Sequence, residues 1–460
     1  MHTPRPGLRP CRGGRGRPFD ASRAADVPHG YIEEEHLLSG TATAYRDAPA
    51  EPGQVGVRAH APYVTRILTR TPEPQERFNG TVVVEWFNVS SFMDAGVEWL
   101  YTHPELMRGG YAWVGVSAQC AGVTGSALPP DGAAPGGLKA WDPDRYGTLH
   151  HPGDDYSYDI FSQAGQAIAG LFPGARLIAA GQSLAAYRLT TYINKIDPIA
   201  RAFHGYLVHS RIGPASLLEL PDPPQMDPRP VPFRDDLRVP VLTLITETDL
   251  ITADYLAARQ PDGPRLRIWE IAGTAHVDTY VDVAAGHDMT RLEPARMAAA
   301  LAPRDRAAGF DVGHTVNAAP QHHYVANAAI HSLARWVHDD TPAPHAPRLD
   351  IRPGPPPEFR RDDLGNALGG IRSPWMDAPT AVLTGISPND GLIERLFGQT
   401  IPFTGATLAR LYPGGADDYL AAFGTATDAA LAEGFLLEAD ADEIKALATA
   451  AYHAAHGRTS

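Results

Sequence analysis

Three residues of this sequence have side chains that together could carry out nucleophilic catalysis, and they follow one another as Ser183, Asp249 and His276. A serine hydroxyl is a weak nucleophile at neutral pH, so a base such as histidine must take its proton during the attack. A carboxylate must in turn hold that histidine in the tautomer that accepts the proton. We therefore interpret Ser183 as a candidate nucleophile, His276 as its base and Asp249 as the residue that orients the histidine.

A second acidic residue competes with Asp249 for this orienting role. Glu247 lies two residues earlier, in the same segment Thr246-Glu-Thr-Asp249. In a turn at the end of a strand, we expect Glu247 to point away from the histidine. The sequence therefore favours Asp249, with Glu247 as the alternative.

The residues around Ser183 predict a strand, a tight turn and a helix. Residues 177–180 form a short apolar run typical of a buried strand, and residues 181–185 form the turn. We expect strained backbone angles at the serine, and small residues at 181 and 185 where strand and helix pass closely. The helix that follows has apolar residues at helical spacing, and we expect Asp197-Pro198 to end it.

The acid and the histidine also follow predicted strands, at residues 239–245 and 266–271. Carboxyl ends of neighbouring parallel strands converge at one edge of a sheet, where catalytic residues gather. Further apolar runs predict strands at 63–69, 80–87, 111–117 and 203–209, and an edge strand within 32–45. Helical spacing of apolar residues predicts helices at 95–108 and 156–171. Alternating strands and helices predict a mostly parallel sheet with helices on both faces.

The order serine, acid, histidine along the chain is that of the α/β-hydrolase fold, and the strand–turn–helix around Ser183 fits its nucleophile elbow. Such a site needs two N–H groups for the oxyanion that forms during attack. We assign these to the backbone amides of Leu184 and Val89, with the Asn88 side chain as the competing donor to Val89. Asn88 and Gln182 are also candidate substrate-binding residues.

The chain divides into three parts by composition. We expect residues 1–28, rich in Arg, Gly and Pro, to be a disordered basic tail. Residues 29–300 should form the α/β-hydrolase core, with inserted loops at 121–155 and 210–238. Residues 301–460 should form a helical and irregular extension with helices at 324–338, 417–432 and 440–455. Because these helices have apolar faces, we expect the extension to pack on the core.

The extension contains a glycine-rich segment, residues 365–375, that mixes glycines with Ile371, Arg372 and Trp375. We interpret Arg372 and Trp375 as substrate-binding residues in a part of the extension that covers the site. The alternative is a brace on the far side of the sheet, where Arg372 pairs with a surface carboxylate.

Composition limits the remaining possibilities. The formal charge of −14 argues against nucleic-acid binding, because phosphates would be repelled. The two cysteines cannot form a disulfide framework, and no apolar run approaches the length of a membrane span. No signal peptide is visible, so we expect a cytoplasmic protein, with secretion left open. The histidines at 150–151, 314 and 322–323 lack metal-binding spacing, so we expect core or solvated histidines, with no metal and no cofactor.

Several stretches together resemble a large bacterial group of alpha/beta hydrolase domain-containing proteins. The matching stretches are Val84-Glu-Trp-Phe-Asn-Val-Ser90, Trp113-Val-Gly-Val-Ser-Ala-Gln119, Trp141-Asp-Pro-Asp-Arg-Tyr146, Pro152-Gly-Asp-Asp155, Gly181-Gln-Ser-Leu-Ala185, Gly273-Thr-Ala-His276 and Gly365-Asn-Ala-Leu-Gly-Gly-Ile-Arg372. This resemblance implies that the serine of the elbow is the nucleophile. It also implies that the extension belongs to the family and is not a separate fused domain.

These observations lead us to expect a serine hydrolase that cleaves small-molecule carboxylic esters through an acyl-enzyme. The fold alone leaves other reactions open, namely acyl transfer or cleavage of lactones and amides. A non-catalytic binding protein of the same fold is an alternative from another class, and the intact Ser, Asp and His argue against it. The oligomeric state stays undetermined.

Overall fold

The computed structural model describes residues 6–19, 30–48, 54–125, 136–220, 227–307, 309–391 and 393–456. Nine strands of this part of the chain form one sheet in the order β1-β2-β3-β5-β4-β6-β7-β8-β9. Their bounds are β1 (Gly7–Pro10), β2 (Tyr31–Asp47), β3 (Val55–Pro72), β4 (Thr81–Trp86), β5 (Ala112–Val116), β6 (Arg176–Gln182), β7 (Gly205–His209), β8 (Val241–Thr246) and β9 (Leu266–Ile271).

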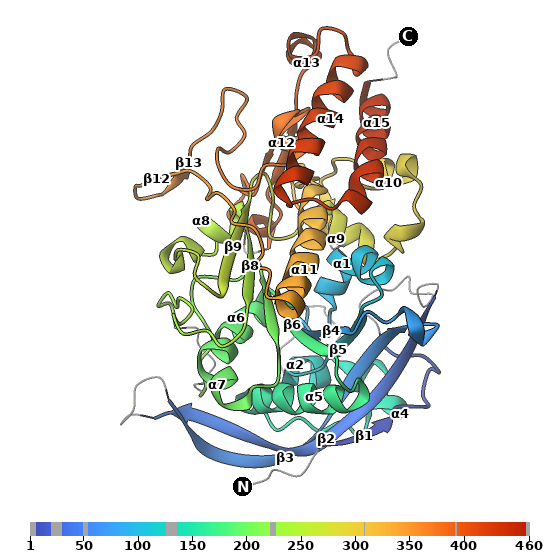
Figure 1. Cartoon of the computed structure of the whole chain (residues 1–460), viewed down its shortest axis with the longest axis vertical. Helices are drawn as coiled ribbons and strands as arrows, with labels where there is room; N and C mark the ends of the chain where they lie inside the picture. Colours follow the sequence, from blue (N-terminus) through green and yellow to red (C-terminus); the bar gives the residue numbers. More distant parts are fainter. Residues whose placement is uncertain are drawn as a thin grey trace.

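The sheet is mixed but mostly parallel. Strands β5, β4, β6, β7, β8 and β9 run parallel to one another, whereas β1, β2 and β3 add on antiparallel to the β5 edge. Figure 1 shows the long β2–β3 hairpin at one end of the molecule and helices α13 to α15 at the other. The predicted α/β-hydrolase fold, with a mostly parallel sheet flanked by helices, is confirmed.

Helices cover both faces of the sheet because the buried strands carry apolar side chains on both sides. On β7, Leu207 packs into one hydrophobic cluster, and its neighbours Tyr206 and Val208 pack into the other. Helices α1 (Val97–Arg108) and α11 (Gln321–Asp339) contribute to the first cluster, and α5 (Ser157–Leu171) and α6 (Leu184–Thr191) to the second. The period of two along each strand thus fixes which helix meets which face.

Shorter elements complete the described part of the chain. The remaining helices are α2 (Cys120–Thr124), α3 (Leu138–Trp141), α4 (Pro143–Tyr146), α7 (Asp197–Ala200), α8 (Glu247–Ile251), α9 (Thr279–Ala284), α10 (Pro294–Ala300), α12 (Pro374–Asp377), α13 (Gly405–Leu411), α14 (Ala416–Glu433) and α15 (Ala441–His456). The remaining strands form three hairpins: β10 (Arg306–Ala307) with β11 (Phe310–Asp311), β12 (Ile351–Arg352) with β13 (Glu358–Phe359), and β14 (Ala381–Thr384) with β15 (Gln399–Pro402). Within the described ranges, no helix is both long and apolar enough to cross a membrane.

The expected disordered tail at residues 1–28 needs correction for residues 6–19. Gly7–Pro10 forms β1, which pairs antiparallel with β2. The Arg145 side chain then donates hydrogen bonds to the carbonyls of Cys11 and Gly13. Because β1 lies outside β2, the predicted strand within 32–45 is also not at the edge of the sheet. The other residues of the expected tail lie outside the described ranges.

The helix after Ser183 also continues past its predicted end. A π-helical turn at Tyr192–Ile196 follows α6, and the Asp197 N–H donates to the Tyr192 carbonyl. Helix α7 then begins with Pro198 in its first turn. The N–H groups of a first turn have no acceptor within the helix, so proline costs no hydrogen bond there. The helical run therefore ends only at Arg201, whose φ of 49° is left-handed.

The extension is joined to the core by backbone hydrogen bonds and by packing. Ile371 forms a parallel bridge to Ile271 at the end of β9, and its N–H donates to the Glu270 carbonyl. Helix α11 contacts β7 and β8, although it lies beyond the expected boundary at residue 300. Figure 1 shows α11 running from the sheet toward α14 and α15. This part of the expected extension is therefore one layer of the hydrolase core.

Candidate active site

The turn after β6 gives Ser183 an unusual backbone conformation. Its φ is 58° and its ψ is −117°, a region that costs a non-glycine residue conformational energy. A Cβ added at Gly181 would lie 2.9 Å from the Ala185 Cβ, so the strand and the helix are too close for a larger residue at either position. Both features agree with the expectation for the turn, and they leave Ser183 partly exposed at the start of α6.

The three candidate catalytic side chains form a continuous hydrogen-bond chain. The Ser183 Oγ lies 2.8 Å from the Nε2 of His276, and the Nδ1 of His276 lies 2.6 Å from the Oδ1 of Asp249. Asp249 is fully buried and His276 is 5% exposed, whereas Ser183 is reachable from solvent. This is the arrangement that a serine nucleophile, its base and an orienting acid require.

Asp249 is held in place by the start of helix α8. Its Oδ2 accepts a hydrogen bond from the Thr246 N–H, and the Thr246 hydroxyl accepts one from the Asp249 N–H, which makes a capping box. Burial alone would raise the pKa of Asp249, but His276 and Thr246 outweigh it and hold that pKa below its usual value. The Asp249 side chain is therefore an anion at neutral pH, directed at the histidine.

Glu247, the alternative acid, has other partners. Its carboxylate accepts hydrogen bonds from the N–H groups of Gly273 and Gly385 and from the Thr384 hydroxyl. Burial raises the pKa of Glu247, and Arg361 and these donors act in the opposite direction. Glu247 thus connects the extension to the segment that leads to His276, whereas the carboxylate that is hydrogen-bonded to the histidine ring is that of Asp249.

The two candidate oxyanion donors lie on the residue after Ser183 and on the loop after β4, next to Asn88. Among the described residues, neither the Val89 N–H nor the Leu184 N–H donates to a protein acceptor. The Asn88 amide, expected as a competing donor, instead donates to the backbone oxygen of Gln182 at 3.0 Å and to its Oε1 at 3.3 Å. Its Oδ1 accepts from the Ser90 N–H at 2.7 Å. Asn88 therefore fastens the loop that carries Val89 to the strand that carries Ser183.

The Gln182 side chain also has a structural role. Its Nε2 lies 3.4 Å from the His276 carbonyl, and its Oε1 accepts from Asn88. Both Gln182 and Asn88 are buried. These contacts favour a supporting role for the two residues over the substrate contacts expected from sequence.

Replacing Asn88 with alanine should lower kcat for an ester substrate by about 10- to 100-fold, because the Val89 N–H is no longer fixed. Asn79 is a control for the turn alone, since its Oδ1 accepts from the Thr81 N–H in a turn of the same type at the other end of β4, on an exposed residue. Steady-state kinetics with thermal melting of both variants is the measurement. An equal loss of kcat in Asn79→Ala and Asn88→Ala would contradict this role of Asn88.

The structure gives Arg372 and Trp375 other partners than the expected substrate. The Arg372 guanidinium pairs with Asp377 and donates to the carbonyls of Ala367 and Met376. The Trp375 ring stacks on Tyr324 of α11 at 5.7 Å and packs edge-on against Phe423 of α14 at 5.2 Å. Among the described residues, neither side chain has a hydrogen bond, ion pair or ring contact with Ser183, Asp249 or His276. These contacts favour the alternative of a brace over that of a cover above the site.

Replacing Trp375 with alanine should therefore lower the free energy of unfolding by about 2–4 kcal/mol, because Tyr324 and Phe423 lose the ring that packs against them. The ratio of kcat/KM between short and long acyl esters should stay constant in Trp375→Ala and in Arg372→Ala. Thermal unfolding and a two-substrate comparison measure both effects, with Trp375→Phe as the control that keeps a ring. A shifted ratio at unchanged melting temperature would restore the two residues to the substrate site.

Sequence reasoning missed several residues that hold the site. The Thr248 hydroxyl accepts from the His276 N–H and donates to the Gly385 carbonyl. A buried chain of Glu98, His209, His322 and Asp278 lies behind the candidate triad. The adjacent histidines at 322–323 were visible as a pair, but their partners are far away in the sequence.

The described residues hold no group of three or more His, Cys, Asp or Glu side chains arranged for a metal ion. His151, His322 and His323 are buried in the core, and each is hydrogen-bonded to a protein group.

The sheet topology, the elbow and the hydrogen-bond chain define an α/β-hydrolase, and a family model agrees with this class. The model for the alpha/beta hydrolase domain matches residues 4–446, so the chain belongs to this family over nearly its whole length, extension included.

The solved structures that the chain matches are similar to it only at low identity. A putative dienelactone hydrolase from Klebsiella pneumoniae is 13% identical with a TM-score of 0.32, covering 55% of this chain and 92% of that chain. Esterase Est22 is 11% identical with a TM-score of 0.29, covering 56% of this chain and 76% of that chain. No curated protein sequence matches the chain.

Proposed function

We propose that this protein is a serine hydrolase that cleaves small carboxylic esters. The observation that carries the proposal is the hydrogen-bond chain from Ser183 through His276 to Asp249, at 2.8 Å and 2.6 Å, with the serine on a strained and solvent-accessible elbow. Membership in the alpha/beta hydrolase domain family is consistent with it. The proposed activity depends on these side chains, because the fold alone does not fix a reaction.

The proposed reaction has two halves. In the first, the Ser183 Oγ attacks the ester carbonyl carbon while His276 Nε2 takes the hydroxyl proton. The carbonyl oxygen becomes an oxyanion that accepts hydrogen bonds from the N–H groups of Val89 and Leu184. The C–O bond to the alcohol then breaks, and His276 returns the proton to the departing alkoxide, which leaves an acyl group on Ser183.

In the second half, water replaces the alcohol. His276 takes a proton from the water, whose oxygen attacks the acyl carbon and forms a second oxyanion at the same two N–H groups. The bond to the Ser183 Oγ breaks, His276 protonates that oxygen, and a carboxylic acid leaves. Asp249 stays ionised throughout and stabilises the imidazolium that forms twice in each cycle.

A panel of p-nitrophenyl esters with acyl chains of graded length tests the proposal. The wild-type protein should hydrolyse at least one of them with a kcat of about 1 s⁻¹ or more, the usual range for enzymes. The panel should also show which acyl length the site prefers. Folded protein that releases p-nitrophenol from none of the esters above the buffer rate would speak against an esterase.

A further inference from the structure

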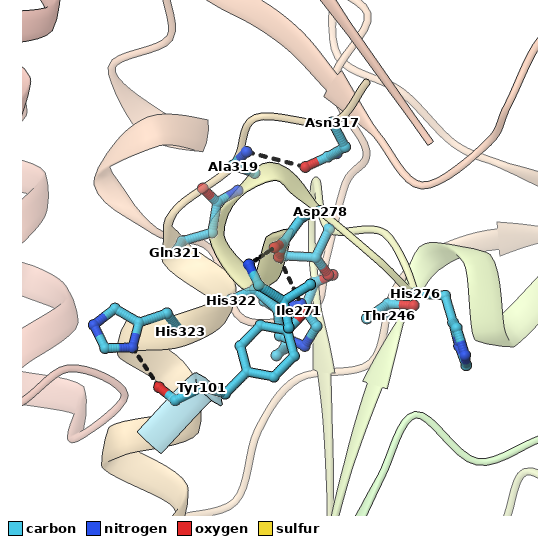
Figure 2. Close-up of polar contacts among 12 residues, drawn as sticks. Tyr101, Thr246, Ile271, His276, Asp278, Asn317, Ala319, Gln321, His322 and His323 are labelled. Atoms are coloured by element: carbon cyan, nitrogen blue, oxygen red, sulfur yellow. Dashed lines mark hydrogen bonds and ion pairs between the residues drawn. The ribbon is translucent and has the colours of Figure 1, made fainter. Parts of the chain in front are cut away.

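A chain of hydrogen bonds runs through the core directly behind the candidate triad. The Nδ1 of His209 lies 3.2 Å from a Glu98 oxygen, and its Nε2 lies 2.7 Å from the Nε2 of His322. The Nδ1 of His322 lies 3.0 Å from the Oδ2 of Asp278. All four side chains are at most 1% exposed. Figure 2 shows His322 and Asp278 facing each other beside the Tyr101 ring, while the ring of His276 points away from them.

The chain connects to the candidate triad through the backbone at two of its members, His209 and Asp278. The carbonyl of His209 accepts a hydrogen bond from the Ser183 N–H at 3.0 Å. Asp278 follows His276 by two residues and caps helix α9, because its Oδ1 accepts from the Val281 N–H. One buried chain therefore touches the segment of the nucleophile and the segment of its base.

The carboxylate of Asp278 gives this chain its direction. Its Oδ1 accepts a hydrogen bond from the Val281 N–H, and its Oδ2 is the acceptor for the Nδ1–H of His322. Burial lowers the pKa of His322, so its ring is neutral and carries a single N–H. With that N–H on Nδ1, the Nε2 of His322 accepts from the Nε2–H of His209. A residue that replaces His322 must therefore offer a donor to Asp278.

We propose that His322 and Asp278 are positioning residues that fix the segment carrying His276 relative to Ser183. The inference rests on the proposed function and deepens it by extending the site to a second layer of side chains. The Nδ1–H of His322 holds the carboxylate of Asp278, and Asp278 in turn holds the start of α9 and the loop from His276. His209 and Glu98 complete the chain at the side of the elbow.

Two substitutions at His322 separate the two contacts of its ring. Asparagine places an amide N–H near the position of Nδ1, so His322→Asn keeps a donor to Asp278 and loses the contact with His209. Glutamine reaches the position of Nε2, so His322→Gln keeps the contact with His209 and loses the donor to Asp278. His322→Ala removes both.

His323 offers a matched control on the same helix. It is equally buried, stacks on Tyr280 at 4.0 Å, and its Nδ1 hydrogen-bonds to the Tyr101 carbonyl, outside the chain. His323→Gln removes that one contact, as His322→Gln removes the contact with Asp278. Loss of stability should be similar in the two glutamine variants, whereas loss of turnover should be confined to His322→Gln.

The experiment measures kcat, KM and melting temperature with p-nitrophenyl acetate for these variants and for Ser183→Ala. We expect His322→Gln and His322→Ala to lower kcat by about tenfold or more with KM changed less than about twofold, because misplacement of a catalytic group slows chemistry. His322→Asn should retain at least about five times the kcat of His322→Gln. If His322→Ala does not fold, the kcat of His322→Asn compared with that of His322→Gln still tests the inference.

Two results would overturn the inference. One is a kcat in His322→Asn no higher than in His322→Gln, and the other is a kcat in His323→Gln as low as in His322→Gln. Either would make the chain a source of stability alone. Failure of the proposed function is distinguishable, because Ser183→Ala would then hydrolyse the ester at the wild-type rate.

Discussion

Replacing Ser183 with alanine should lower kcat/KM for p-nitrophenyl acetate by at least about 10⁴-fold and leave the fold intact. The reason is chemical, since no other hydroxyl lies within hydrogen-bond distance of His276 Nε2 among the described residues. The fold should survive because the Ser183 Oγ has His276 as its one hydrogen-bond partner in the described chain, and alanine adopts the same backbone angles at similar cost.

Kinetics and circular dichroism of the purified variant measure the effect. Ser90→Ala is the control for loss of a hydroxyl near the site, because Ser90 is exposed on the loop that carries Val89. Its kcat/KM should stay within about threefold of the wild type, as is usual for an exposed side chain outside the reaction. Hydrolysis by Ser183→Ala near the wild-type rate would remove Ser183 from the role of nucleophile.

The second large effect distinguishes the two buried acids. Asp249→Asn should lower kcat by about 10⁴-fold, because the amide no longer selects the tautomer of His276 that accepts the serine proton. Glu247→Gln should instead lower the melting temperature, since its amide cannot accept from all three donors on Gly273, Thr384 and Gly385. An unsatisfied buried donor costs about 1–3 kcal/mol.

The measurement for this pair is kcat per folded molecule, with folding followed by circular dichroism. Glu247→Gln should keep kcat within about tenfold of the wild type once its lower stability is taken into account. A larger loss of kcat in Glu247→Gln than in Asp249→Asn, at unchanged melting temperatures, would reverse the assignment of the orienting acid.

The central sheet and the candidate triad were predictable because local sequence determines them. The β-branched run of β4 is buried on both faces, and such a run has few other stable conformations. Ser183, Asp249 and His276 each follow a strand of this kind, so the parallel order of β6, β8 and β9 brings them to one edge. Their relative positions follow from topology, which the strand pattern indicates.

Features that depend on distant partners were not predictable in the same way. Gly7–Pro10 has no apolar alternation, and it becomes a strand because its backbone pairs with β2. Arg372 and Trp375 have side chains suited to a pocket. In the structure Arg372 forms an ion pair with Asp377, and the Trp375 ring stacks on Tyr324. His209 and His322 are 113 residues apart, so their contact leaves no local pattern.

The most direct test of the account is covalent labelling with a fluorophosphonate, which reacts with activated serines. Trypsin cleaves after Arg176 and Arg188 and releases residues 177–188, a peptide whose only serine is Ser183. Mass spectrometry of this peptide from the wild-type protein should show one phosphonyl group on Ser183, and the Asp249→Asn variant should label far more slowly. Folded wild-type protein that stays unlabelled at Ser183, or that carries the label on another residue, would contradict the assignment of Ser183 as the nucleophile.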